Sequence, residues 1–177
     1  MNESVMYASY NEASNRTIFA LLEKMSNEER EKDRGSYYGS LSLLFRHILG
    51  AIQFFLGMYK TALKGNPEAL KAISAIENLP KLPEGALSEE QWKELESTAN
   101  AVNAAYINMA LALKESDLSL PVEVAWYGGN PASVPLSFML SQLVVHNTHH
   151  RGQISQILDS LKIENDYSGI NVSLLQT

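Results

Sequence analysis

Apolar residues recur at spacings of three and four in four long stretches of this chain, which is typical of amphipathic helices. The first covers residues 5–26, with the stripe Tyr7, Tyr10, Ser14, Thr17, Ile18, Leu21 and Met25. The second covers residues 38–63 and is the most apolar, with the stripe Leu41, Leu44, Ile48, Ile52, Phe55 and Tyr59.

Two further helices are predicted in the second half. Ser88 and Gln91 match a capping box, which places a helix start there and a helix over residues 88–113. Its stripe is Trp92, Leu95, Ala99, Val102, Tyr106, Met109 and Leu113. Pro135 suits the first turn of a final helix over residues 135–162. The predicted core positions of that helix are Phe138, Leu140, Leu143, Val144, Ile154, Ile157, Leu158 and Leu161.

The connections between these helices differ in length. Gly65, Asn66 and Pro67 break the chain before a short helix over residues 67–77. Residues 118–134 alternate between apolar and polar and contain the turn signal YGGNP, so they predict a short β-hairpin. The expected fold class is therefore all-α, a four-helix bundle with a short hairpin between the third and fourth helices.

Length and composition agree with one globular unit. The chain has 177 residues, 45% hydrophobic and 19% charged, which suits a single domain over residues 1–177 with its own core. Its net charge of −6 argues against a nucleic-acid partner, because phosphate binding needs a positive surface. No run of about 18 apolar residues predicts a membrane span, and the first twenty residues are too polar for a signal peptide. We therefore expect no membrane partner and a cytoplasmic protein.

The four histidines are the candidate chemistry. With no cysteine in the chain, a bound metal must be held by imidazole nitrogen or by oxygen. His146 and His150 are separated by i, i+4 and can face one point, but His149 stands at i+3 from His146. The spacing permits both pairings, 146 with 150 and 146 with 149.

His47 lies in the middle of the second predicted helix and is the third ligand if that helix faces the last one. Three neutral imidazoles suit a divalent transition metal, Zn, Ni, Co or Fe, and leave coordination positions open. Close to the motif, Gln153 can orient a ligand or a bound water, and Asn15 of the first helix can line the cavity. Arg151 is interpreted as a solvated charge.

The segments that carry these histidines resemble a known family. "HNTHHRGQIS" is similar to the H-x-x-x-H-R-G-Q signature of the DinB-like (damage-inducible, YfiT-related) family. "GSLSLLFRHILGAIQFFL" resembles its second helix with the single metal-binding histidine, and "YNEASNRTIFALL" resembles its first helix. The resemblance implies an up-down-down-up bundle, often homodimeric, with a divalent metal held by His47, His146 and His150. His149 then becomes a neighbour of the ligands or a surface residue.

The same resemblance implies a small-molecule reaction, since family members include transferases and isomerases that use low-molecular-weight thiols. Activated water would instead give a metal-dependent hydrolase, although no general base accompanies the motif as the Glu of H-E-x-x-H does. A non-catalytic metal- or ligand-binding stress protein is the alternative from another class.

A homodimer is also expected from the residues themselves. The second helix carries Leu43, Phe45, Phe54 and Phe55 beside its main stripe, more apolar surface than one core needs.

Overall fold

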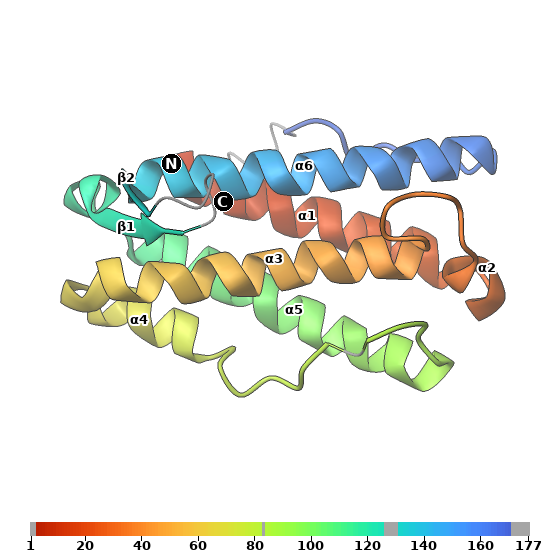
Figure 1. Ribbon diagram of the computed structural model, residues 1–177, viewed down its shortest axis with the longest axis horizontal. Coiled ribbons are helices and arrows are strands. Elements are labelled where there is room, and N and C mark those ends of the chain that lie inside the picture. Colours follow the sequence, from red (N-terminus) through yellow and green to blue (C-terminus); the bar gives the residue numbers. More distant parts are fainter. Residues whose placement is uncertain (1–2, 83, 126–130, 171–177) are drawn as a thin grey trace.

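The computed structural model describes residues 3–82, 84–125 and 131–170, which are mostly helical with one small antiparallel sheet (Figure 1). The α-helices are α1 (Glu3–Glu23), α2 (Asn27–Glu31), α3 (Leu41–Ala62), α4 (Pro67–Ser74), α5 (Glu89–Ala112) and α6 (Leu136–Ser160). The strands are β1 (Pro121–Val124) and β2 (Ala132–Pro135), and the short 3-10 helices are η1 (Leu63–Gly65) and η2 (Glu115–Ser119).

The long helices α1, α3, α5 and α6 lie side by side along the longest axis of the molecule (Figure 1). Helices α1 and α6 run in one direction, and α3 and α5 run in the other. The largest contact is between α3 and α6, followed by α4 with α5 and α1 with α5. The α3 and α6 contact brings the segment with His47 against the segment with the other three histidines.

Side-chain caps set the helix starts. The Ser88 side chain accepts a hydrogen bond from Gln91 N, and the Gln91 side chain accepts one from Ser88 N, so the predicted capping box is confirmed. Ser40 caps α3 in the same way through Leu43 N. The predicted start at residue 38 was therefore three residues early, because the cap at Ser40 leaves residue 38 in the loop before α3.

The two central stripes are confirmed. Every predicted stripe residue of α3 and α5 is buried in the hydrophobic core. Phe45 and Phe55 also belong to that core, whereas Leu43 is half-buried and Phe54 is 56% exposed. Most of the surplus apolar surface expected on this helix is thus covered within the subunit, because α3 contacts α1, α5 and α6 at once.

The predicted stripe of helix α1 is confirmed in part. Tyr10, Ser14 and Ile18 are buried, whereas Thr17 is exposed. The interior also receives Ala8, Asn11, Asn15 and Leu22. Because some interior positions of α1 are polar, hydrophobic periodicity does not identify the whole buried face of this helix. The amides are accommodated because they bond to one another and to Arg151, as described below.

The predicted hairpin is confirmed in its strands, which pair from Pro121 with Pro135 to Val124 with Ala132. The first part of the predicted segment forms η2, and residues 126–130 of the expected turn lie outside the described residues. Pro135 is the cap residue rather than part of the first turn of α6. Phe138 was wrongly predicted as core, since 46% of it is exposed.

One segment, Leu41–Gly65, is long and apolar enough by length and composition to cross a membrane, contrary to the expectation that no such stretch exists. Its best window has a mean hydropathy of 1.5, and 56% of that window is buried inside the molecule. Core helices of soluble proteins have this property too, and the contacts of α3 on several sides fit that interpretation.

Candidate metal centre

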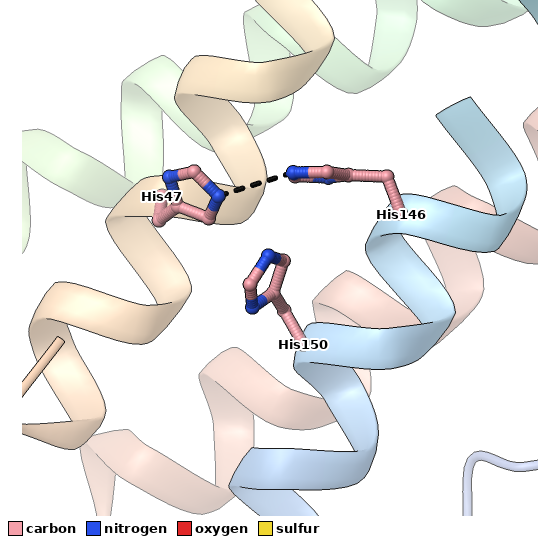
Figure 2. Close-up of side chains that lie close together, drawn as sticks. All are labelled: His47, His146 and His150. Carbon is pink, nitrogen blue, oxygen red and sulfur yellow. Dashed lines mark hydrogen bonds between the residues drawn. The ribbon is translucent and has the colours of Figure 1, made fainter. Parts of the chain in front are cut away.

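Three imidazole rings converge between α3 and α6 (Figure 2). His47 comes from α3, and His146 and His150 come from successive turns of α6. One ring nitrogen from each lies within 4.8 Å of the others, and His47 Nε2 is 3.1 Å from His146 Nε2. Among the described residues this is the one such group of histidine and carboxylate side chains, and it could hold a metal ion.

Two hydrogen bonds on α6 select the ring nitrogens that face the centre. His146 Nδ1 lies 3.2 Å from Asn147 Oδ1, and His150 Nδ1 lies 2.8 Å from Gln153 Oε1. Because an amide oxygen only accepts, each Nδ1 carries the proton and Nε2 keeps its lone pair. An outer acceptor of this kind commonly fixes the tautomer and orientation of metal-binding histidines.

Burial keeps two of the three histidines, His47 and His150, neutral. Burial, followed by repulsion from His150 and His146, lowers the pKa of His47 from 6.5 to about 4. Burial also lowers the pKa of His150, although its hydrogen bond with Gln153 acts in the opposite direction. Both rings are therefore uncharged at neutral pH, as a metal ligand must be.

Tyr38 is a member of the site that the sequence reading missed. Its hydroxyl lies 3.0 Å from His47 Nε2, its ring stacks on His47 at 4.1 Å, and its edge meets the ring of His150 at 5.4 Å. Burial raises the pKa of this phenol. The residue begins the helix that was predicted over residues 38–63 but lies outside its apolar stripe, and in the structure it belongs to the loop before α3. Only the folding of that loop over the cluster reveals its role.

His149 lies outside the three-histidine group. It is exposed, and its ring contacts only the outer side of the cluster, at 4.9 Å from the ring of His150. The helix packing therefore brings His146 together with His150, and not with His149 at the i, i+3 spacing.

Asn15 does not contact the histidines but belongs to a buried polar network that reaches them. Asn103 Oδ1 accepts hydrogen bonds from Asn15 Nδ2 and Asn11 Nδ2. Asn11 Oδ1 accepts from Asn147 Nδ2 at 2.9 Å, and Asn147 Oδ1 in turn accepts from His146. The network links α1, α5 and α6 to the orientation of one imidazole.

Arg151 is part of the same network, so its interpretation as a solvated charge is wrong. Only 3% of it is exposed, its Nη1 donates to Asn11 Oδ1 at 3.0 Å, and its guanidinium lies 4.9 Å from the ring centre of Tyr10. Burial lowers its pKa from the usual value. The motif arginine thus stabilises the interior beside the site, and its partners come from a helix more than a hundred residues away in sequence.

A cavity of about 450 Å³ opens beside the cluster. Its lining residues are His47, Gly50, Ala51, Phe54, Phe55, Gln142 and His146. Two of the three imidazoles therefore border this space, while Tyr38 contacts His47 and His150. A molecule in the cavity would lie next to any ion held by the histidines.

The donor set fits a divalent transition metal. Three neutral imidazoles with outer acceptors are a usual ligand set for Zn and for Ni, Co and Fe, and they leave positions for water or substrate. The group includes no carboxylate, so a bound divalent ion would keep its positive charge.

Comparison with known proteins gives the family. No curated protein and no solved structure matches the chain. The DinB family model matches residues 1–161, which include all four histidines and every long helix. The match covers far more than half of the chain and includes the three histidines that meet in the structure. The chain therefore belongs to the DinB family.

Proposed function

We propose that this DinB protein binds one divalent transition metal through His47, His146 and His150 and uses it for transfer or isomerisation with a low-molecular-weight thiol. The convergence of three ring nitrogens within 4.8 Å carries the proposal. Zn, Ni, Co and Fe are the candidate ions.

An ion at this site would supply a Lewis acid that lowers the pKa of a bound thiol or water. The chain's own residues supply the rest. Asn147 and Gln153 hold two imidazoles in the required tautomer, and Tyr38 presents a hydroxyl at the edge of the cluster. The apolar residues Ala51, Phe54 and Phe55 of α3 line the cavity on one side of the site.

Thiol chemistry is favoured over hydrolysis by the composition of the site. The ligand group contains only imidazoles. Hydrolases of the H-E-x-x-H type use a Glu beside the ligands as the base that activates water, and no carboxylate belongs to this group. Non-catalytic metal binding is the outcome to be excluded by experiment.

The remaining expectations are part of the same proposal. We infer that the four long helices form the up-down-down-up bundle of the family, as one domain over residues 1–177. We also propose a cytoplasmic homodimer that acts on a small molecule and binds neither nucleic acid nor membrane. The net charge of −6 supports the exclusion of nucleic acid.

Single alanine variants test the metal site. His47→Ala, His146→Ala and His150→Ala are each expected to abolish stoichiometric binding of Co²⁺ or Zn²⁺, because two imidazoles alone hold such ions weakly. His149→Ala is the matched control on the same helix and is expected to keep most of the binding. Elemental analysis of protein purified without a histidine tag and titration of the visible spectrum of Co²⁺ measure this.

Two results would contradict the proposal at different levels. If His149→Ala removes the metal and His150→Ala does not, the ligand set is wrong. If the metal-free protein transfers a thiol to an electrophile as fast as the loaded protein, the metal has no catalytic role in the transfer.

A further inference from the structure

The cavity beside the histidines has an unusual composition for a space that borders a metal site. Apart from His47 and His146, the one polar residue among the described residues of its lining is the amide Gln142. The other walls are the rings of Phe54 and Phe55 and the small residues Gly50 and Ala51. Within the part of the chain that the structure describes, no charged side chain is among the lining residues.

The shape and size of this space suit a small molecule. Ligand cavities usually measure about 300–1,000 Å³ and combine an apolar lining with a few polar groups. Here the two small residues of α3 leave room next to His47, while the phenylalanines form an aromatic wall, with ring centres 5.8 Å apart. The ring of Phe55 also lies 6.2 Å from the ring of His146, so the wall leads directly to the cluster.

The lining selects by charge as well as by size. A carboxylate or phosphate group placed between the phenylalanines, away from the histidines, would lose its hydration and find no cationic side chain among the described residues of the lining. An uncharged aromatic or alkyl group would gain burial against the phenylalanine rings. Gln142 can offer one hydrogen bond to a neutral polar substituent such as a nitro or carbonyl group.

We propose that this cavity is the binding site for the second substrate, an uncharged apolar electrophile such as an aryl or alkyl halide. This assignment rests on the proposed thiol-transfer function. The reaction forms a bond between the thiol sulfur and the substrate carbon, and the carbon–halogen bond breaks. The halide leaves with the bonding electron pair, and the thiol proton passes to solvent, so no oxidant or reductant is needed.

Binding can be measured without turnover. Nitrobenzene is uncharged, apolar and carries no leaving group, and benzoate is its anionic counterpart of similar size. Saturation-transfer NMR on the metal-free protein is expected to show binding of nitrobenzene and at least about fivefold weaker binding of benzoate. In protein loaded with Co²⁺, the protons of bound nitrobenzene should relax much faster than in protein loaded with diamagnetic Zn²⁺.

Two glycines on α3 provide a matched pair of variants. A Cβ at Gly50 would meet Leu82 Cδ1, at 3.6 Å, and Gly50 is among the residues that line the cavity. A Cβ at Gly57 would meet nothing within 4 Å, and Gly57 does not line the cavity. Gly50→Leu should weaken nitrobenzene binding at least about fivefold by filling the space, and Gly57→Leu should leave it unchanged.

Phe54→Ala is a second variant for the case in which Gly50→Leu does not fold. Because Phe54 is 56% exposed, its removal should leave the fold intact while lowering the affinity for nitrobenzene about two- to tenfold. Activity is then measured with 1-chloro-2,4-dinitrobenzene as the aryl halide and glutathione, cysteine or 2-mercaptoethanol as the thiol. The natural chain and Gly57→Leu are the reference proteins. Gly50→Leu should raise the KM for the aryl halide more than the KM for the thiol.

The outcomes separate this inference from the proposed function. Equal binding by Gly50→Leu and Gly57→Leu, or slow relaxation of nitrobenzene in Co²⁺-loaded protein, overturns the cavity assignment and leaves the metal site standing. The cavity assignment is also overturned if nitrobenzene does not bind and Phe54→Ala dissociates a dimer. The phenylalanine wall would then be the contact surface for a second copy of the chain. If no metal binds but nitrobenzene still does, the proposed function fails and the cavity remains a binding site.

Discussion

Individual side chains around the three histidines decide which ring nitrogen is available and over which pH range. Two amide oxygens hold protons on Nδ1, and burial keeps His47 and His150 neutral. The i, i+4 spacing of His146 and His150 predicted that two rings can face one point. The amide partner of His146, its sequence neighbour Asn147, gave no comparable signal, because an asparagine in a helix has many uses.

The lowered pKa values predict how the metal-free protein responds to acid. Histidines in the unfolded chain take up protons near pH ~6.5, whereas His47 in the folded protein does so only near pH 4. Between these values the unfolded state binds more protons, so the free energy of unfolding falls as pH falls and is fully retained above this window. Urea denaturation of demetallated protein from pH 7.5 to 4 measures this.

The matched control for the acid response is His47→Gln, which removes the titrating group at the same position. Its unfolding free energy should change less between pH 6.5 and 4 than that of the natural chain. An equal or steeper change in this variant would show that His47 is not held neutral by the fold.

Gln153 provides a second prediction for a single side chain. Gln153→Ala removes the acceptor of the His150 Nδ1 proton, at 2.8 Å, and should weaken metal binding about 10- to 100-fold. Gln153→Glu keeps an acceptor and should bind metal close to the natural affinity. Competition with a chromophoric chelator measures both, and Gln156→Ala, an exposed neighbour on α6, is the control. An unchanged affinity in Gln153→Ala would contradict the orienting role.

At the level of elements, two kinds of contact hold the site. Helices α3 and α6 bring the imidazoles together, and a polar network ties α1 and α5 to the far side of α6. Hydrophobic periodicity predicted α3 and α5 correctly because their interior positions are apolar. It identified only part of the buried face of α1, where Asn11 and Asn15 are buried and bonded to groups that are distant in sequence.

A substitution of Asn103 tests how much this network of buried amides stabilises the packing of α1 against α5. Asn103 accepts from Asn11 Nδ2 and Asn15 Nδ2, both buried, so Asn103→Ala leaves two donors without that acceptor. The free energy of unfolding should fall by about 2–4 kcal/mol in urea denaturation. Asn108→Ala, at an exposed position of the same helix, should change it by less than about 0.5 kcal/mol. Similar effects of the two variants would refute a structural role for the network.

At the scale of the whole molecule, assembly and metal binding are expected to be independent. All three candidate ligands come from one chain, and the exposed large apolar side chains of the described residues include Phe54, Leu111 and Val145. Leaving aside Phe54, which lines the cavity, the exposed side chains Leu111, Phe138 and Val145 favour association between copies. Sedimentation equilibrium at micromolar concentration should therefore show a dimer both with metal and after its removal. A monomer in both forms would contradict the proposed dimer, and a dimer only with metal would place a ligand between subunits.

The sequence by itself determined the elements and the candidate chemistry. Apolar spacing, the capping box at Ser88 and the turn residues encode local structure, and the absence of cysteine left imidazole and oxygen as the only metal donors. The family resemblance added the ligand set, which agrees with the three rings that the fold brings together.

Only the tertiary structure decided which neighbours the histidines have. His149 and His150 lie on different sides of α6, and the packing of α3 against one side selects His150, since spacing along a helix does not say where a partner helix lies. The loop that places Tyr38 on His47, the buried Arg151 and the apolar cavity depend likewise on contacts between residues far apart in sequence. Such contacts are formed by long-range packing, and local patterns of polar and apolar residues do not encode them.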